Sequence, residues 1–479
     1  MAIPGTEKPS SAPVRPRLGV PGIVFFVVAA SAPLTVAAGG MPTAFAVTGV
    51  VGTPLLYVLL AILLTLFTGG YAAMSRSISN AGAFYAYVTH GLGRVAGVGT
   101  AFVALLAYNT MQIGLYGLFG FSIADFIAAK TGVALPWWLV ALVAVAVVAV
   151  LGYRRIDLNA QVLGVLLAIE FLTVLVFDFG QLGQAPEGLS AGPLTFGALG
   201  EGALGAAFCF SMAAFMGFEA AAIYSEEVKD PRRTVGRATY IAVGLIGVFY
   251  AFTAWAMVMG AGPGQVIAQA RKHTTGLLFT LAAEHIGAVF ADVAQVFLIT
   301  SIFAAMLSFH NAVARYFFSL GREGVLPGGL GRTHDRHRSP HVGSVTQTAL
   351  AAVAVAAFAL AGQDPVLALF NWLTNLGALG VIFLLALISV AVVGYFARDR
   401  RGEHAWNRLI APIVSGVGLV VVFVLALLNF GALLGAAQGS VLTWALPGLI
   451  FVAGAAGLAF ALYLRSARPE VYARIGRGE

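Results

Sequence analysis

Apolar runs of roughly 20 residues recur along almost the whole chain, and each is long enough to cross a hydrocarbon core of about 30 Å as a helix. Only 10% of the 479 residues are charged, whereas soluble domains carry about 25%. The sequence therefore predicts an all-α polytopic membrane protein with about 12 transmembrane helices. Their expected limits are 18–46, 52–74, 94–128, 135–152, 158–181, 201–223, 235–260, 288–318, 342–361, 366–396, 407–433 and 440–464.

The distribution of basic residues predicts the orientation of these spans. Lys130, Arg271 and Lys272 fall in one set of alternating loops, and all other Lys and Arg residues fall in the other set or at the termini. The positive-inside rule then places both termini in the cytoplasm. Topology explains the net charge of +7 better than nucleic-acid binding does. Few lysines among many arginines, with abundant Ala, Gly and Val, suggest a GC-rich genome and hence a bacterial inner membrane.

The rest of the chain leaves little room for other domains. Residues 1–17 are polar and Pro-rich, so we expect a disordered cytoplasmic N-terminal tail, and residues 466–479 form a cytoplasmic C-terminal tail. Residues 18–465 then form one membrane domain. The single Cys209 excludes an internal disulfide. The single cysteine allows no Cys-x-x-Cys metal site, and no phosphate-binding G-x-x-x-x-G-K-S/T motif occurs. We therefore expect no metal, no cofactor and no ATP-driven activity.

Two of the predicted spans are interrupted. The first contains Pro33, the pair Gly39-Gly40 and Pro42, and the sixth contains Gly217 close to an acidic residue. Pro33 has no N–H to donate, so the carbonyl of Ala29 is expected to lose its helical partner. Such a break leaves carbonyls suited to an ammonium group and N–H groups suited to a carboxylate. Interrupted helices five spans apart are typical of inverted-repeat transporters with a site at the bilayer midplane.

Three predicted cytoplasmic stretches resemble the amino acid–polyamine–organocation (APC) superfamily of permeases. They are "SRSISNAGAFYAYV" (75–88), "GFEAAAIYSEEVKDPRRTVGRA" (217–238) and "ARYFFSLGREGVLP" (314–327). The resemblance implies a LeuT-like fold, in which a 5+5 inverted repeat is followed by two peripheral helices. The first repeat would be 18–181, the second 201–396, and the additional helices 407–464. It also implies alternating-access transport of amino acids or related amines.

The resemblance and the interruptions together suggest where a substrate binds. Many relatives have a Gly-Ser-Gly-like break in the first span, where this chain has small residues and a proline. Phenylalanines flank Gly217, and polar side chains of other spans are placed to complete a cavity. The expected substrate-binding residues are Ala29, Ala30, Ser31, Ala32, Pro33, Thr35, Tyr108, Gln112, Phe215, Gly217, Phe218 and Asn311. For the aromatic and polar members, plain helix packing is the alternative.

Carboxylates inside spans are candidates for proton coupling or gating. An ionised acid near the bilayer centre costs roughly 2.5–3.5 kcal/mol on insertion scales, so it should be neutral, paired or hydrated. Glu219 adjoins the second break and matches the family's acidic position, and Glu170 lies in the fifth span, where some proton-coupled relatives carry a lysine. A structural hydrogen bond is the alternative role for each. Asp178, near a span end, is expected to be an external-face residue.

These observations favour a secondary active transporter of amino acids, proton-coupled or exchanging. The small-molecule substrate and the lipid bilayer are its expected partners, with protons as the coupling ion. An amine or polyamine permease of the same family is the alternative. An integral membrane enzyme is disfavoured because His310 is the only histidine well inside a span. A channel is disfavoured because no repeated selectivity-loop motif occurs.

Overall fold

A computed structural model describes residues 19–78, 84–154, 160–219, 228, 230–337, 339–435 and 440–477. The expected tail 1–17 and parts of the stretches 75–88 and 217–238 lie outside these residues. Throughout the described chain the secondary structure is helical, with no β-strand element, as the sequence predicts.

The long helices follow the predicted apolar runs to within a few residues. The main helices are α1 (Val20–Ser31), α2 (Pro33–Thr35), α3 (Met41–Thr48), α4 (Thr53–Ser75), α5 (Phe84–Leu92), α6 (Arg94–Thr131), α7 (Trp137–Arg154), α8 (Ala160–Gly183), α9 (Leu204–Phe215), α10 (Pro231–Ala261), α11 (Val266–His273), α12 (Leu277–His285), α13 (Ala288–Arg322), α14 (His341–Leu360), α15 (Asn371–Arg398), α16 (Ala411–Leu428), α17 (Phe430–Leu434), α18 (Leu442–Ala467) and α19 (Pro469–Arg474).

Eleven helices of the described chain are long and apolar enough to span a membrane, the first being the interrupted run Val20–Thr48. The sixth predicted span is the exception, because its helix α9 has only 12 residues and stops at Phe215. The protein is thus a multi-pass, all-helical membrane protein. Its exposed helix faces are apolar, as a lipid environment requires.

Two helices with an early proline, α3 and α16, are preceded by a wide helical turn. The π-helical segments η1 (Val36–Gly40) and η9 (Trp406–Ile410) each end two residues before a proline, Pro42 and Pro412 respectively. A proline cannot donate to the preceding turn, and its ring crowds the carbonyl four residues earlier. A π-turn places one extra residue in the helix and relieves that contact. The first span therefore continues through Pro42 without a second break.

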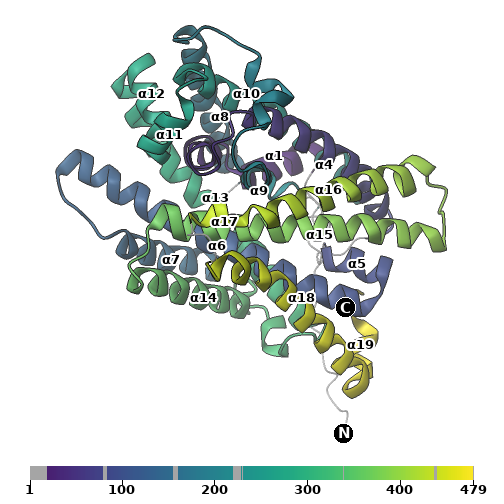
Figure 1. The fold of residues 1–479 in the computed structure, drawn as a ribbon. Coiled ribbons are helices and arrows are strands. Elements are labelled where there is room, and N and C mark those ends of the chain that lie inside the picture. Colours follow the sequence, from purple (N-terminus) through teal and green to yellow (C-terminus); the bar gives the residue numbers. More distant parts are fainter. Residues whose placement is uncertain are drawn as a thin grey trace.

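Helix α6 lies near the centre of the bundle, where it contacts α7, α13, α15 and α18 (Figure 1). Its packing against α15 depends on small residues. A Cβ atom at Gly377 would lie 2.7 Å from the carbonyl oxygen of Ala107, and one at Gly114 would lie 3.1 Å from the backbone nitrogen of Thr374. Close approach of helix backbones through glycine is a usual source of helix association in membranes.

The C-terminal segment packs against the helical domain. Helix α19 follows α18 after one residue, and the Gly476 N–H donates to the Glu323 carboxylate at 2.9 Å. Ile475 is 2% exposed. At least this part of the segment 466–479 is therefore ordered on the domain.

The contact between α6 and α15 can be tested with Gly377→Ala. The added methyl group overlaps the Ala107 carbonyl, and overpacking of this kind costs about 1–3 kcal/mol. We expect a lower midpoint of thermal unfolding for the purified protein in detergent. The matched control is Gly244→Ala in α10, where no atom lies within 4 Å of the new Cβ. Equal midpoints for the two variants would contradict the role of this contact.

Candidate functional site

The first interruption is a single left-handed residue between α1 and α2. Ala32 has φ 48° and ψ 75°, a conformation that non-glycine residues rarely adopt. Its N–H donates to the Ala29 carbonyl at 3.1 Å, so the expectation that this carbonyl is free is wrong. Two further carbonyl groups of α1 also accept hydrogen bonds. The Ser31 hydroxyl donates to Val28 O at 2.8 Å, and the Tyr250 hydroxyl donates to Ser31 O at 3.1 Å.

The N–H groups that begin the second half of this span point to a carboxylate of the protein itself. Leu34 N–H donates to Glu170 Oε2 at 3.3 Å, and the Ser301 hydroxyl donates to the same oxygen at 2.7 Å. Both the N–H and the hydroxyl of Thr35 donate to Ser301 Oγ, at 3.3 and 2.9 Å. Glu170 therefore caps a helix N-terminus, where negative charge is favoured. A substrate carboxylate would have to find other donors.

The second interruption touches the first. After α9 ends at Phe215, Met216 has extended ψ (134°) and Gly217 has φ 107°. A Cβ atom at Gly217 would lie 3.0 Å from the Cβ of Ala30. Glycine is required here both for its positive φ and for this close approach, and the two breaks are therefore in direct contact.

Glu219 fastens the second interruption to its neighbours. Its carboxylate accepts hydrogen bonds from the Tyr108 hydroxyl on α6 and from the Gly217 N–H, the latter at 3.1 Å. The Tyr71 hydroxyl on α4 donates to the Glu219 carbonyl at 2.9 Å. Glu219 is fully buried, so these three donors satisfy a carboxylate and a carbonyl that have no access to water.

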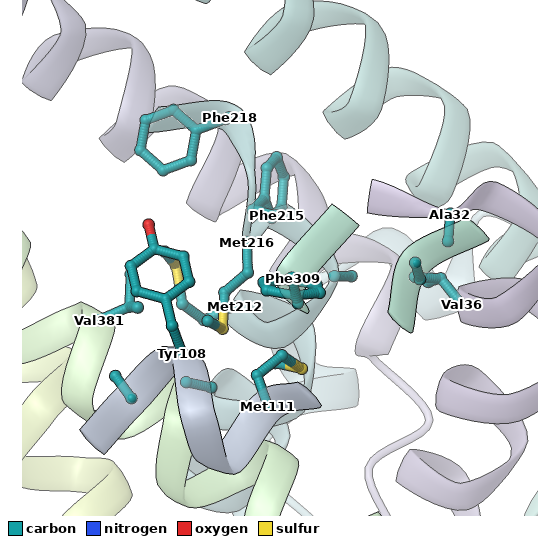
Figure 2. Close-up of a cluster of buried hydrophobic side chains, with 14 of the residues drawn as sticks. Ala32, Val36, Tyr108, Met111, Met212, Phe215, Met216, Phe218, Phe309 and Val381 are labelled. Carbon is teal, nitrogen blue, oxygen red and sulfur yellow. The ribbon is translucent and has the colours of Figure 1, made fainter. Parts of the chain in front are cut away.

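A cavity in which the centres of water molecules could occupy about 60 Å³ lies beside the two breaks. Figure 2 shows Met111, Met216 and Phe309 on the side of Ala32 and Val36 that faces Tyr108. No charged side chain lines the cavity among the described residues. The lining residues are Ala30, Ser31, Ala32, Thr35, Val36, Gly40, Tyr57, Met111, Leu115, Phe210, Ala213, Ala214, Met216, Ala305, Phe309, Phe370 and Thr374.

Four of the predicted binding residues line this cavity, namely Ala30, Ser31, Ala32 and Thr35. Most of the others lie next to it along the same interruptions. Outside the lining are Ala29, Pro33, Tyr108, Gln112, Phe215, Gly217, Phe218, Asn311, Glu170 and Glu219. Asn311 is half-buried, and the Phe218 ring packs edge-on against Phe67 with centroids 6.1 Å apart.

Gln112 belongs to a separate buried polar network. Its amide nitrogen lies 3.2 Å from both the Tyr116 hydroxyl and His310 Nδ1, and its oxygen accepts from Gln347. His310 Nε2 lies 2.8 Å from the Ser344 hydroxyl. The polar face of α6 therefore turns toward α13 and α14. His310, the only histidine well inside a span, is part of helix packing.

The cavity residues that the sequence did not indicate are mostly apolar side chains inside apolar spans. Met111, Leu115 and Phe210 differ in no visible way from residues that face lipid. The sequence predicted the polar Gln112 as a binding residue, but its apolar neighbour Met111 is the one that lines the cavity. Asp178 was also misjudged, because it is fully buried instead of lying on the external face.

The sequence also matches known proteins over nearly its full length. Residues 18–455 match the amino acid permease family. The branched-chain amino acid permease BcaP of Bacillus subtilis is 24% identical over 402 residues, which cover 81% of this chain and 82% of that protein. The low-affinity putrescine importer PlaP of Escherichia coli K12 is 24% identical over 435 residues, 87% of this chain and 86% of that protein.

A second BcaP, from Lactococcus lactis subsp. cremoris, is 25% identical over 411 residues, 80% of this chain and 82% of that protein. These relatives are transporters, and the match extends through both interrupted spans. The chain belongs to the amino acid permease family, within the APC superfamily of membrane transporters, and is not an enzyme.

Proposed function

We propose that this protein is a secondary active transporter that moves neutral amino acids with apolar side chains across the cell membrane by alternating access. The observation that supports this proposal most strongly is the set of side chains that line the cavity beside the two breaks. Ser31, Thr35, Tyr57 and Thr374 are its polar side chains, and aliphatic, methionine and phenylalanine side chains form the rest. An apolar wall with a few polar groups at one end is typical of a site for a small amphipathic ligand.

The main chain at the two breaks is the polar end of this site. Ala30 to Ala32 and Met216 line the cavity where the regular helical hydrogen bonding ends. The N–H groups of Leu34 and Thr35 already donate within the protein. A carbonyl oxygen has two lone pairs, so the Ser31 carbonyl, which accepts from Tyr250, can still accept from the ammonium of an amino acid. The apolar wall then receives its side chain.

The same lining argues against the amine alternative. Putrescine carries a cation at each end, and a buried cation needs a paired anion. Glu170 and Glu219 lie outside the lining, and their oxygens already accept hydrogen bonds from the protein. The apolar cavity fits the substrate class in the name of the BcaP relatives better than the one in the name of PlaP.

The larger arrangement supports the expected inverted repeat. The third and eighth predicted spans, α6 and α13, are the longest helices of the described chain, with 38 and 35 residues. The first and sixth are the two that break, also five spans apart. We therefore propose repeats over 18–181 and 201–396, with 407–464 as additional helices. Helix α9 is then part of the sixth span, which brings the total to twelve. The loop charges support cytoplasmic termini in a bacterial inner membrane.

The two buried carboxylates suit different tasks in this proposal. Glu219 connects the second break to α6 through its hydrogen bond with Tyr108. This hydrogen bond must change whenever the break moves relative to α6, so Glu219 is suited to act as a gate. Glu170 contacts the first break directly through the Leu34 N–H. Protonation of Glu170 would weaken its interaction with the helix N-terminus. We therefore assign proton coupling to Glu170 and gating to Glu219.

The substrate class is tested by counterflow in proteoliposomes with leucine, isoleucine, valine, methionine, lysine, glutamate and putrescine. We expect exchange of the four apolar amino acids only. Ala305→Leu fills the cavity and should reduce leucine exchange at least tenfold, with a smaller loss for valine, which has the smallest side chain of the four. Ala349→Leu on the exposed face of α14 is the matched control and should exchange leucine normally. Putrescine exchange without amino acid exchange would refute this assignment.

The gate is tested by a double-mutant cycle between Tyr108→Phe and Glu219→Gln. Hydrogen bonds to charged groups contribute about 1.5–3 kcal/mol, so each single variant should slow leucine counterflow about tenfold or more. If both act through one contact, the double variant should be no slower than the worse single variant. Tyr116→Phe on the same helix, which does not contact Glu219, serves as the control. Additive losses would mean that the two residues act separately.

Coupling is tested with Glu170→Gln. The glutamine oxygen can still accept from Leu34 and Ser301, but the side chain cannot exchange a proton. We expect leucine counterflow within about twofold of wild type and loss of accumulation driven by an inward proton gradient. Accumulation that survives the substitution would exclude Glu170 as the coupling group. A wild type that responds to no gradient would make the protein an exchanger.

A further inference from the structure

Helix α8 carries an unexpected row of polar side chains on its buried face. The opposite face is apolar and exposed, with Leu172 and Phe179 63% and 64% exposed. The buried polar residues are Glu170, Thr173, Asp178 and Gln181, each at most 7% exposed. Polar side chains at membrane depth are costly and usually mark an ion or substrate path. The Thr173 hydroxyl is satisfied within its own helix, because it donates to Ile169 O. Asp178 and Gln181 have no such partner within α8.

Asp178 and Gln181 each keep one polar atom without a partner among the described residues. Thr253 on α10 donates to Asp178 Oδ2 at 2.9 Å, while Asp178 Oδ1 is buried and unbonded. Gln181 Oε1 lies 2.7 Å from His285 Nδ1 on α12, while Gln181 Nε2 is buried and unbonded. The two side chains are one turn apart on the same face. Gln181 Nε2 is a donor and Asp178 Oδ1 is an acceptor, so the two unsatisfied atoms are chemically complementary.

The outer end of this row reaches the protein surface. His285 is half-buried at the last residue of α12, on the side of the bundle that the loop charges assign to the exterior. Histidine gains and loses a proton at physiological pH more readily than other side chains do. His285 is therefore the residue of this row that lies at the surface, with the buried Gln181 directly behind it.

The inner end of the row reaches the first interruption. Glu170 and Asp178 are eight positions apart on α8, which corresponds to a rise of about 12 Å along the helix. A proton can cross this distance only through water or hydroxyl groups, and the Thr173 hydroxyl lies between the two carboxylates in the sequence. The elements packed on α8 carry further ionisable groups. In the described residues, α1 and α2 carry none, and the other elements carry Arg232, Arg233, Arg237, Tyr240 and Tyr250 on α10, Glu284 and His285 on α12, and Asp292, His310, Arg315, Tyr316 and Arg322 on α13. Of these, His285 hydrogen-bonds to Gln181 in the row.

We propose that this row, defined as His285, Gln181, Asp178 and Glu170, is the path by which protons reach the coupling carboxylate from outside. One proton enters at His285, is carried by water past the Gln181 amide, which cannot itself pass a proton, and reaches Asp178. Water carries it on to Glu170, which it neutralises, and it is released from Glu170 on the cytoplasmic side when the breaks open there. Asp178 acts through Glu170 and is a positioning and relay residue. This inference depends on the proposed proton coupling, and substrate specificity does not depend on it.

The test compares Asp178→Asn with Asp292→Asn in proteoliposomes. Asp292 pairs with Lys130 at 2.6 Å and is half-exposed, so it is a matched carboxylate at the surface. For Asp178→Asn we expect at least tenfold less leucine accumulation under an inward proton gradient and a flattened dependence on external pH. Leucine counterflow should stay within about twofold of wild type. Asp178→Glu should restore accumulation in part, and Asp292→Asn should behave as wild type.

Other results would overturn the inference. Equal loss of counterflow and accumulation in Asp178→Asn would assign Asp178 a structural role that holds α8 on α10. Unchanged accumulation would show that protons take another route. If Asp178→Asn does not fold, Gln181→Leu removes the link to His285 and should give the same separation of accumulation from counterflow. A wild type that exchanges leucine without responding to protons would refute the path and leave the substrate assignment intact.

Discussion

Peptide groups inside a bilayer must find partners within the protein, because no water is there to replace a missing hydrogen bond. The break at Ala32 is possible only because its neighbours meet this requirement. Glu170 and Ser301 receive the N–H groups of Leu34 and Thr35, and Tyr250 donates to the carbonyl of Ser31. Three helices, α8, α10 and α13, are thereby joined to one interruption. Movement of the break must change contacts to all three.

The second interruption obeys the same rule with different partners. Tyr108 and Tyr71 donate to Glu219, and Gly217 allows the chain to approach Ala30 closely. The two breaks thus share one contact surface, and the cavity opens beside it. The carboxylates of Glu170 and Glu219 accept hydrogen bonds from the breaks but do not line the cavity. The cavity lining consists almost only of apolar side chains. This separation of charge from cavity is the physical basis for proposing apolar substrates in the cavity and proton coupling at Glu170.

Several features were predictable from sequence alone. The helix limits follow from the length of the apolar runs, and the positions of the breaks follow from Pro33 and Gly217, because proline and glycine act on the local backbone. Glu170 and Glu219 were recognisable as candidates, since a carboxylate stands out in an apolar span, and the structure places both in contact with the breaks. Asp178 was misjudged because a position near a span end says nothing about which neighbour covers it.

The sequence by itself determined that this chain is an all-helical membrane protein with two interrupted spans, because hydrophobic length and backbone geometry are local properties. Tertiary structure decided which side chains surround the site. Gln112 turns toward His310 and Gln347 while Met111, its neighbour, lines the cavity. The Ala29 carbonyl accepts from the Ala32 N–H, and the Leu34 N–H donates to Glu170 from a span more than a hundred residues away. Such choices depend on how helices rotate against one another, and no pattern within a single helix records that rotation.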